Sequence, residues 1–311
     1  MIPFLCNPEW AYAAEWLEIL RRAMPDEQIV RLDDLDADAR ARCEVAIVAN
    51  PRPEDVRQLP NLRWVQSLWA GVERLVADLP DARFAIVRLV DPQLAAIMAE
   101  AVLAWTLYLH RDMPAYTAQQ RRHEWTVRPY RRSHDVTVGI LGIGELGEPS
   151  ARRLLDAGFK VRGWSRSVKA LDGIETFAGV EGLPAMLGGC DIVVCLLPLT
   201  PQTTGLLDAR RLGCLPKGAA VINFSRGPVI DDQALRDALD AGQLRHAVLD
   251  VFNQEPLPAA SWHWDHAGVT VLPHISGPND RSTAAKIVAD NLKAFRETGI
   301  VPAAVDRTRG Y

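Results

Sequence analysis

Apolar residues follow two alternating patterns along the chain. Short apolar runs predict buried strands at residues 2–6, 45–48, 62–66, 84–89, 136–141, 160–164, 191–196, 219–223 and 246–251. Apolar positions spaced three and four apart predict helices at residues 10–24, 92–110, 232–241 and 281–298. Strands that alternate with helices indicate parallel sheets covered on both faces, so the fold class is α/β.

The pattern predicts two Rossmann-like lobes with doubly wound parallel sheets. Residues 1–98 form a small α/β unit with no glycine-rich phosphate loop, whereas residues 99–280 contain such a loop. The last helix and its tail, residues 281–311, are too short to fold alone, so we expect them to pack on the first unit. The expected organisation is a discontinuous substrate-binding domain, 1–98 with 281–311, and an inserted dinucleotide-binding domain, 99–280.

A glycine-rich motif lies between the predicted strand 136–141 and a helical pattern. Gly142, Gly144 and Gly147 form G-x-G-x-x-G. In such a motif the first glycine permits the tight turn, the second lets a pyrophosphate approach the backbone, and the third allows close packing of helix and strand. The phosphates then lie at a helix N-terminus, and we place Glu145 and Leu146 among the cofactor-binding residues.

The end of the second strand of this lobe bears on the choice of cofactor. NAD-binding units usually carry an acidic residue there, about 20 positions beyond the glycines. This chain has Ser165, Arg166 and Ser167 instead. A serine hydroxyl and a guanidinium suit a ribose 2′-phosphate, so NADP(H) is favoured and NAD(H) stays possible. A solvated basic turn is the alternative, and it leaves the missing acid unexplained.

Three polar side chains follow late strands of the same lobe. They are Arg226, Glu255 and His274. A 2-keto acid reductase needs a cation for the carboxylate and a proton donor for the developing alkoxide, while the cofactor supplies hydride. Arg226 fits the first role, and His274 oriented by Glu255 fits the second. Taken singly, each has a structural alternative: an ion pair, a surface acid and a core histidine.

The motifs around these residues occur in a fixed order after the glycine motif. They are Asn-x-x-Arg-Gly at 223–227, Asp-Val-Phe-x-x-Glu-Pro-Leu at 250–257 and Pro-His-Ile-x-Gly at 273–277. Together they resemble the D-2-hydroxyacid dehydrogenase family, most closely its glyoxylate/hydroxypyruvate reductase A type. Supporting segments are 177–179, 197–203, 250–258 and 305–311. The resemblance covers nearly the whole chain and is specific from about Glu100 onward.

The resemblance implies roles for individual residues. Arg226 would bind the substrate carboxylate and carbonyl, and His274 with Glu255 would deliver the proton. The backbone N–H groups of Ala70 and Gly71 would also hold the carboxylate. The remaining implied cofactor-binding residues are Leu197, Pro198, Thr203, Phe224, Ser225, Asp250, Ser276 and Gly277. The resemblance further implies a homodimer joined through the cofactor domains.

One departure from the family concerns the turn that holds the carboxylate. The family turn usually reads Gly-Ala-Gly-Val-Asp, whereas residues 69–73 read Trp-Ala-Gly-Val-Glu. The Trp69 ring either points into the core of the small domain or narrows the pocket toward glyoxylate-sized substrates. Both interpretations stay open from the sequence.

Composition and charge narrow the choice of partners. The formal net charge is -4 and the pI is about 6.0, which gives no reason to expect nucleic acid or an anionic membrane. The basic, aromatic segments 121–125 and 130–132 are therefore interpreted as a solvated loop or a dimer contact. The longest apolar run, residues 101–109, is too short to span a bilayer.

Metal and disulfide chemistry are not expected. The five cysteines include no C-x-x-C pair, which is typical of small core residues in a reducing compartment, and we expect a cytoplasmic protein. His263, Trp264 and His266 are not joined by a carboxylate or thiolate set, so we expect a surface loop and no metal there.

The sequence therefore predicts NADPH-dependent reduction of a small 2-keto acid, glyoxylate or hydroxypyruvate, to the D-2-hydroxy acid. One alternative is a non-enzymatic dinucleotide sensor or corepressor-like protein on the same fold. Another is a D-2-hydroxyacid dehydrogenase for a larger or phosphorylated substrate.

Overall fold

The computed structural model describes residues 1–307; residues 308–311, the end of the family-like segment 305–311, lie outside the described residues. The chain divides into unit 1, Met1–Gln93 with Asn279–Tyr311, and unit 2, Leu94–Pro278. These divisions fall a few residues before the expected 98/99 and 280/281. Leu94 and Met98 lie so close to Gly277 that a Cβ there would be 3.2 and 2.8 Å from them, which joins these residues to unit 2.

Unit 1 contains a five-stranded parallel sheet. Its strands are β1 (Ile2–Cys6), β2 (Ile29–Arg31), β3 (Val45–Ala49), β4 (Trp64–Ser67) and β5 (Ala85–Val87). Their order is β2-β1-β3-β4-β5, and every pair is parallel. The helices are α1 (Ala13–Ala23), α2 (Ala37–Ala41), α3 (Pro53–Val56), α4 (Glu73–Asp78) and α11 (Arg281–Thr298).

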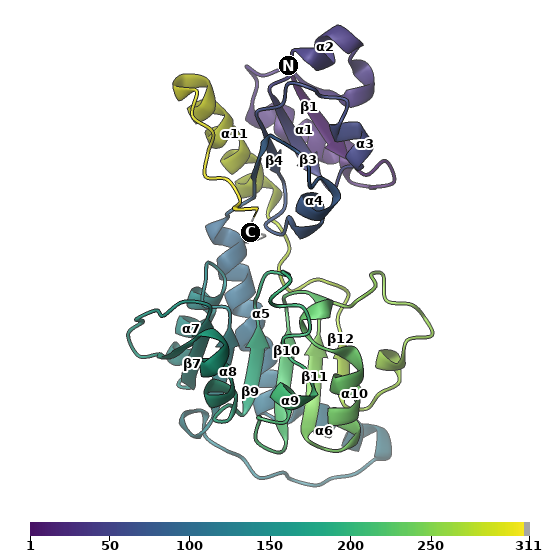
Figure 1. Ribbon diagram of the computed structural model, residues 1–311. Coiled ribbons are helices and arrows are strands. Elements are labelled where there is room, and N and C mark those ends of the chain that lie inside the picture. Colours follow the sequence, from purple (N-terminus) through teal and green to yellow (C-terminus); the bar gives the residue numbers. More distant parts are fainter. Residues whose placement is uncertain (308–311) are drawn as a thin grey trace. The chain divides into compact units, whose positions relative to one another are not determined.

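The helices of unit 1 cover both faces of its sheet (Figure 1). Trp16 of α1 and Leu292 of α11 are buried in one core, and α2, α3 and α4 contribute to the other. Asn291 of α11 donates a 2.8 Å hydrogen bond to Gln66 of β4. The expectation that the last helix packs on the first unit is therefore confirmed.

Unit 2 contains a seven-stranded parallel sheet. Its strands are β6 (Thr137–Leu141), β7 (Lys160–Ser165), β8 (Glu175–Ala178), β9 (Ile192–Cys195), β10 (Ala219–Asn223), β11 (Leu244–Leu249) and β12 (Val269–Val271). The order β12-β11-β10-β9-β6-β7-β8 reverses direction between β6 and β9. In open α/β sheets ligands bind at the carboxyl ends of the strands beside such a reversal.

Helices also cover both faces of the sheet in unit 2. They are α5 (Pro92–His110), α6 (Met113–Arg122), α7 (Gly147–Asp156), α8 (Gly179–Leu187), α9 (Ala209–Leu212) and α10 (Asp232–Asp240). Side chains of α5 and α7 lie in one core, and those of α8, α9 and α10 lie in the other. Two doubly wound parallel sheets confirm the predicted α/β fold class.

The prediction missed short elements and one buried side chain. β2 and β8 are short edge strands with one buried residue and none, so neither presents an apolar run. α6 has no buried residue, so it lacks the apolar stripe that marks a helix. The surface-loop expectation is wrong for His263, which is 6% exposed because it contacts Phe252 and Trp262.

The helix α5 is long and apolar enough, by length and composition, to cross a membrane, with a mean hydropathy of 1.3. Its Met98, Val102 and Leu109 side chains are buried in a core of unit 2. The core helix of a globular domain can have the same length and composition, because its apolar side chains pack against the rest of the domain.

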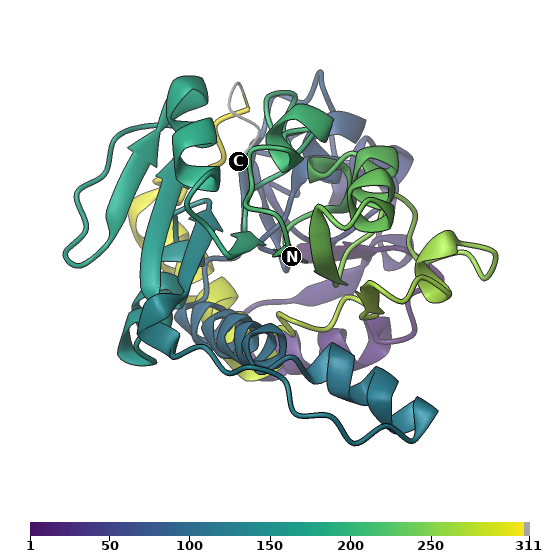
Figure 2. The same cartoon turned by 90° about the horizontal axis from the view of Figure 1, so that it is seen from below.

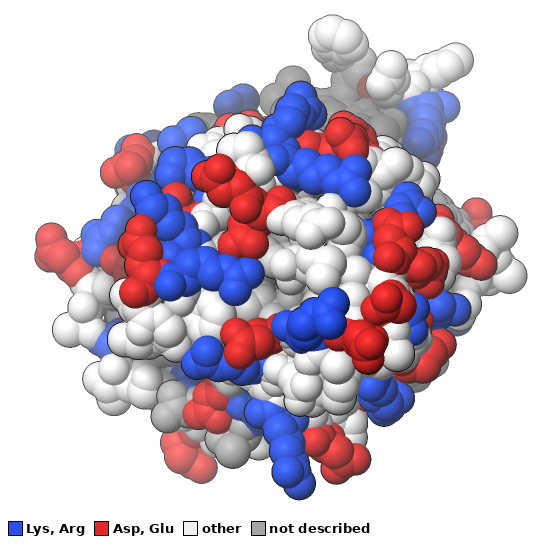
Figure 3. Space-filling view, turned by 90° about the horizontal axis from the view of Figure 1, so that it is seen from above, with Lys and Arg blue, Asp and Glu red and all other residues white. Residues whose placement is uncertain are grey.

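Figure 3 shows Lys and Arg interspersed with Asp and Glu on the face that it displays. On that face the mixed charges leave no extended positive patch of the kind that attracts a polyanion. The five cysteines are free, and Cys43, Cys190 and Cys195 are buried.

Two positions around the β6–α7 turn require glycine, one because of its backbone conformation and the other because of close packing. Gly142 has a φ of 103°, in the left-handed region that favours glycine. A Cβ on Gly147 would lie 1.9 Å from the Gly142 carbonyl oxygen, whereas a Cβ on Gly144 would meet nothing within 4 Å. The turn is therefore tight at both ends and open in the middle.

We predict that Gly147→Ala destabilises the protein by about 1–3 kcal/mol, because the added methyl group forces α7 away from the turn. The matched control Gly144→Ala should change stability by less than about 0.5 kcal/mol. Urea unfolding followed by circular dichroism measures both variants. Equal midpoints for the two variants would contradict the packing account.

Candidate active site

The open middle of the β6–α7 turn exposes backbone donors. Gly144 and Glu145 are exposed, and α7 begins at Gly147. Within residues 1–307, the N–H groups of Glu145 and Leu146 donate no hydrogen bond to the protein. Free N–H groups at a helix N-terminus attract anions. The turn therefore fits a dinucleotide pyrophosphate, as the glycine motif predicted.

The carboxyl end of β7 carries cations and hydroxyl groups. Ser165 ends the strand, and its Oγ donates a 2.6 Å hydrogen bond to the Ser167 carbonyl oxygen. Arg166 and Ser167 are exposed. Lys169 follows, and its Nζ donates to the carbonyl oxygen of Ile143 inside the glycine turn. This edge has no carboxylate between 165 and 170, which fits a ribose 2′-phosphate better than a bare 2′-hydroxyl.

Arg226 is held by the last residue of β10. The side chain of Asn223 is 1% exposed, and its Oδ1 accepts hydrogen bonds from the Ser225 N–H (3.1 Å) and Oγ (2.7 Å). Its Nδ2 donates to the Arg226 carbonyl oxygen at 3.0 Å. These three bonds fix the turn from which the half-buried Arg226 side chain projects.

Gly227 lets this turn pack on the segment that follows β11. A Cβ on Gly227 would lie 2.1 Å from the backbone carbon of Phe252. The Phe252 N–H in turn donates a 2.9 Å hydrogen bond to Oε1 of Glu255. The turn that carries Arg226 and the segment that carries Glu255 are therefore in direct backbone contact.

Glu255 and His274 form a hydrogen-bonded pair. The His274 Nδ1–H donates to Oε2 of Glu255 at 2.7 Å, because a carboxylate can only accept. The two side chains are 36% and 52% exposed. This orientation leaves Nε2 of His274 as the atom able to donate a proton elsewhere.

The backbone around His274 is fixed by a buried carboxylate. Asp250, 2% exposed, accepts hydrogen bonds from the N–H groups of Ile275 (2.7 Å) and Ser276 (2.9 Å). His274 itself has a φ of 54°, a left-handed conformation that costs about 1–3 kcal/mol in a non-glycine residue. Asp250 offsets that cost and so sets the direction of the imidazole.

The charges of the pair reinforce each other. The hydrogen bond to Glu255 raises the pKa of His274, and this outweighs burial and the Arg226 charge, which lower it. Burial alone would raise the pKa of Glu255, but hydrogen bonds from His274 and the Phe252 N–H hold that pKa below its ordinary value. The pair therefore favours imidazolium beside carboxylate, the form that can deliver a proton.

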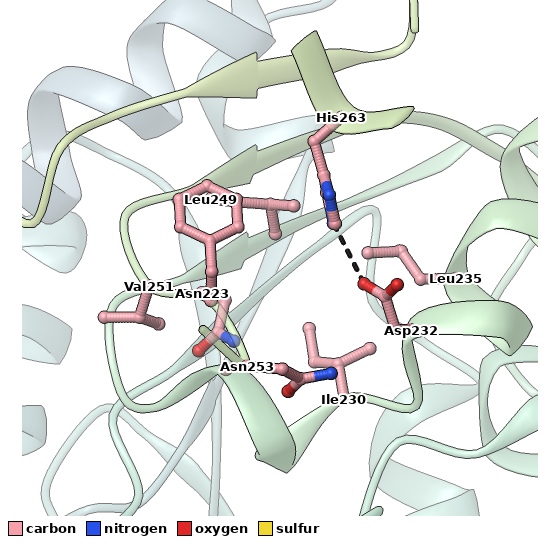
Figure 4. Close-up of a pocket in the computed structure, with 10 residues that line it drawn as sticks. Asn223, Ile230, Asp232, Leu235, Leu249, Val251, Asn253 and His263 are labelled. Carbon is pink, nitrogen blue, oxygen red and sulfur yellow. Dashed lines mark ion pairs between the residues drawn. The ribbon is translucent and has the colours of Figure 1, made fainter. Parts of the chain in front are cut away.

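A small pocket lies behind these turns (Figure 4). Asn223, Asp232, Asn253 and His263 are among the residues that line it. His263 Nε2 lies 2.9 Å from Oδ1 of Asp232, and its Nδ1 lies 2.7 Å from Ser261 Oγ. Burial lowers the pKa of His263 despite Asp232. This contact between His263 and Asp232 ties the segment after Glu255 to α10.

The other residues predicted to bind cofactor divide by what their side chains contact. Phe224 and Leu197 are buried in the cores, so only their backbones are available to a ligand. The carbonyl oxygen of Pro198 accepts a 2.7 Å hydrogen bond from Oγ1 of the buried Thr203, and this bond stabilises the loop that contains both residues. Ser276 is 5% exposed, and its buried Oγ has no partner within residues 1–307.

The residues predicted to bind substrate from the smaller domain lie after β4 in unit 1. Trp69 packs edge-on against Trp10 and Trp16, with ring centroids 5.4 and 6.4 Å apart. The half-buried ring therefore packs against the core of unit 1, as the first of the two interpretations expects, whereas its effect on substrate size stays a prediction. Within residues 1–307, the N–H groups of Ala70 and Gly71 donate no hydrogen bond to the protein, so they remain available to an anion.

Sequence reasoning missed the hydrogen bonds by which Asn223 and Lys169 hold backbone carbonyl oxygens of these turns. Asn223 is the first residue of the motif at 223–227. Its position at the end of a strand, three residues before Arg226, was the signal that could have indicated its contact with this turn. Lys169 gave only a charge beside a basic turn. Among residues 1–307 no cluster of three or more histidine, cysteine or carboxylate residues could hold a metal ion.

Known proteins are similar to this chain in sequence and fold. The sequence model of the NAD binding domain of D-isomer specific 2-hydroxyacid dehydrogenases matches residues 103–276, more than half of the chain. A D-isomer specific 2-hydroxyacid dehydrogenase from Xanthobacter autotrophicus Py2, crystallised with NADPH and MES, is 39% identical with a TM-score of 0.91, and the match covers 99% of each chain.

Two further solved structures are similar over their whole length. An NADPH-dependent glyoxylate/hydroxypyruvate reductase from Sinorhizobium meliloti, in complex with NADP and sulfate, is 33% identical with a TM-score of 0.88, and the match covers 100% of both chains. A probable 2-hydroxyacid dehydrogenase from Rhizobium etli CFN 42, in complex with NADP, HEPES and L(+)-tartaric acid, is 31% identical with a TM-score of 0.89, covering 99% of each chain. The chain belongs to the D-isomer specific 2-hydroxyacid dehydrogenase family, a family of oxidoreductases.

Proposed function

We propose that this protein reduces a small 2-keto acid, glyoxylate or hydroxypyruvate, to the D-2-hydroxy acid with NADPH. The observation that carries the proposal is the hydrogen-bonded pair of Glu255 and His274, joined through backbone contact to the turn of Arg226. A dinucleotide sensor has no need of a proton donor, so the pair favours an enzyme. Three similar structures contain NADPH or NADP, and the Sinorhizobium meliloti protein is a reductase of the proposed kind.

Unit 2 is proposed to hold the cofactor and unit 1 to contribute to substrate binding. Gly144, Glu145 and Leu146 would hold the pyrophosphate, while Ser165 and Arg166 would hold the 2′-phosphate. When bound, the nicotinamide supplies the hydride for the carbonyl carbon. Ser276, whose Oγ has no hydrogen-bond partner in the described part of the chain, and Gly277 are proposed to face the same ligand.

Side chains and backbone groups of the protein bind the substrate and supply the proton for its carbonyl oxygen. The Arg226 guanidinium pairs with the substrate carboxylate and polarises the carbonyl oxygen, because it stays charged and presents a fork of donors. The N–H groups of Ala70 and Gly71 are proposed to hold the same carboxylate. Before the reaction Glu255 stabilises the positive charge of the His274 imidazolium. As negative charge develops on the carbonyl oxygen, Nε2 of His274 donates its proton there, which leaves a neutral imidazole hydrogen-bonded to Glu255.

The proposal is tested by NADPH oxidation with glyoxylate, hydroxypyruvate, pyruvate and phenylpyruvate, repeated with NADH. We expect rapid turnover of the two small acids with NADPH. Turnover of phenylpyruvate alone would indicate a dehydrogenase for larger substrates. Tight NADPH binding without turnover of any keto acid would favour the sensor.

We predict that His274→Ala lowers kcat by about 10²–10⁴-fold, the usual contribution of a general acid. Arg226→Ala should mostly abolish turnover, because it removes both the carboxylate partner and the polarising charge. The control His134→Ala removes an exposed histidine and should keep wild-type rates. Steady-state kinetics check all three variants, and a near-normal rate in His274→Ala would refute the assignment.

The pH dependence follows from the raised pKa of His274. Keto-acid reduction needs the imidazolium, so kcat/KM should fall as pH rises through that pKa, above the ordinary value of about 6.5. Glu255→Gln removes the charge that raises the pKa, and the fall should move to lower pH. Rate profiles across pH for both proteins measure the shift, and identical midpoints would contradict the role of Glu255.

A homodimer through unit 2 is also proposed. No residue of α6 is buried, and in the extended segment 123–132 the side chains of Trp125, Val127 and Tyr130 are 98%, 84% and 61% exposed. Figure 1 shows this segment along one edge of unit 2, between α6 and β6, and Figure 2 gives a second view of α6. Exposed apolar groups gathered on one segment are typical of an interface.

We predict that light scattering gives twice the chain mass of 34.4 kDa for the wild type. Trp125→Glu should shift the protein toward monomer, because a charge is costly inside an apolar interface. Trp264→Glu, at a tryptophan that is 51% exposed elsewhere on unit 2, is the control and should leave the dimer intact. A monomeric wild type, or a Trp125→Glu dimer, would contradict this interface.

The five free cysteines fit a reducing compartment, and we propose that the enzyme works in the cytoplasm.

A further inference from the structure

The carboxylate of Asp232 holds two neighbouring aromatic side chains. Asp232 is the first residue of α10, and its Oδ1 lies 2.9 Å from Nε2 of His263 (Figure 4). Its Oδ2 accepts a 3.0 Å hydrogen bond from Nε1 of Trp262. The two rings are stacked, with centroids 4.0 Å apart and an angle of 23° between their planes. We call Asp232, Trp262 and His263 the Asp232 clamp.

One side of the clamp is anchored in unit 2 by the start of α10. Asp231 precedes Asp232, and its side chain accepts a 2.8 Å hydrogen bond from the Ala234 N–H, which caps the helix. The Asp231 N–H donates to the Leu207 carbonyl oxygen at 3.1 Å, and the preceding Ile230 is buried in the core. The backbone that carries the Asp232 carboxylate is therefore fixed.

The other side of the clamp leads to Glu255. The ring of His263 meets the ring of Phe252 nearly at a right angle, with centroids 5.2 Å apart. The N–H of the same Phe252 donates a 2.9 Å hydrogen bond to Oε1 of Glu255. His263 therefore supports the residue whose backbone holds the Glu255 carboxylate.

His263 fills its place in the clamp as a neutral ring. A carboxylate only accepts hydrogen bonds, so the proton of the imidazole lies on Nε2, toward Asp232. Nδ1 then accepts from Oγ of Ser261 at 2.7 Å, which gives both ring nitrogens a partner. Burial and the nearby His266 lower the pKa of His263 despite Asp232, so the ring keeps these contacts at neutral pH.

We propose that Asp232 is a positioning residue that acts through the clamp on the pair of Glu255 and His274. Glu255 can orient His274 only while its own carboxylate is held, and the residue that holds it, Phe252, packs against the clamp. Loss of the Asp232 carboxylate would free this segment and weaken the hydrogen bond from His274 to Glu255. The kinetic consequence rests on the proposed function, whereas the hydrogen bond itself can be followed without turnover.

The test compares the pKa of His274 in the full-length wild type and its Asp232→Ala variant, by NMR titration of labelled histidine. We expect that pKa to fall toward its ordinary value of about 6.5, because the hydrogen bond that raises it becomes weaker. We also expect kcat with glyoxylate and NADPH to fall about 10-fold, less than in His274→Ala, because the proton donor is displaced and not removed.

A second variant and a matched control accompany this test. Trp262→Phe keeps an aromatic ring but loses the hydrogen bond to Asp232, so it should lower the pKa of His274 by a smaller amount. Asp240→Ala removes a carboxylate at the other end of α10, 3.2 Å from Nε2 of His266, and leaves the clamp in place. The control should keep the wild-type pKa of His274 and the wild-type kcat.

An unchanged pKa of His274 in Asp232→Ala would overturn the proposal whatever the rate, because a slower enzyme would then reflect lost stability alone. An equal fall of that pKa in Asp240→Ala would also overturn it, since any loosened contact with α10 would then suffice. Should Asp232→Ala fail to fold, Trp262→Phe decides in the same way.

The same data separate this inference from the proposed function. If the wild type reduces no keto acid and the pKa of His274 still falls in Asp232→Ala, the reductase assignment fails and the clamp keeps its role. If the wild type reduces glyoxylate and that pKa does not change in the variant, the assignment stands and only the role of Asp232 is lost.

Discussion

The hydrogen bond between His274 and Glu255 is the interaction on which the site depends. It turns the imidazole so that Nδ1 is occupied and Nε2 remains free, and it raises the pKa of His274. Neither effect would survive if the two side chains could rotate independently. The surrounding backbone prevents this, because the Phe252 N–H holds one oxygen of Glu255 and Asp250 holds the residues after His274. The left-handed conformation of His274 is the local cost of this arrangement.

A parallel sheet explains why residues distant in sequence meet at this site. β10, β11 and β12 are neighbours and point the same way, so the chain leaves all three at one edge. Arg226, Glu255 and His274 follow these strands in order. Gly227 then brings the first two segments into backbone contact, and a side chain at that position would separate them. The site is therefore a consequence of strand order, completed by one glycine and by the buried side chains of Asn223 and Asp250.

The architecture could be predicted because each long helix or strand carries its pattern of apolar residues within one continuous stretch of sequence. The helix at 281–298 and the strands at 2–6 and 219–223 were predicted with the bounds that the structure has. β2 and β8 were missed because they are short edge strands with one buried residue and none, so neither presents an apolar run. α6 was missed because none of its residues is buried. The burial of His263 depends on Asp232 and Phe252, which are distant along the chain and approach it only in the folded protein.

The charged residues of the candidate site could be predicted from the sequence, but the residues that hold them in place could not. Arg226, Glu255 and His274 were identified because charged groups after strands of a Rossmann unit point to chemistry. Asn223 and Lys169 act through hydrogen bonds to backbone carbonyl oxygens, and such bonds leave no signature in the sequence. The orientation of Trp69 also depends on packing, since Trp10 and Trp16 lie far from it along the chain and surround it in space.

The most direct test is an NMR titration of His274 in protein with isotopically labelled histidine, assigned by comparison with a His274→Asn variant. The account predicts a pKa for His274 above the ordinary value of about 6.5 in the wild type and a clear fall in Glu255→Gln. It also predicts that Nδ1 carries the proton of the neutral form, because that atom donates to Glu255. A wild-type pKa at or below the ordinary value, unchanged in Glu255→Gln, would contradict the central role of this pair.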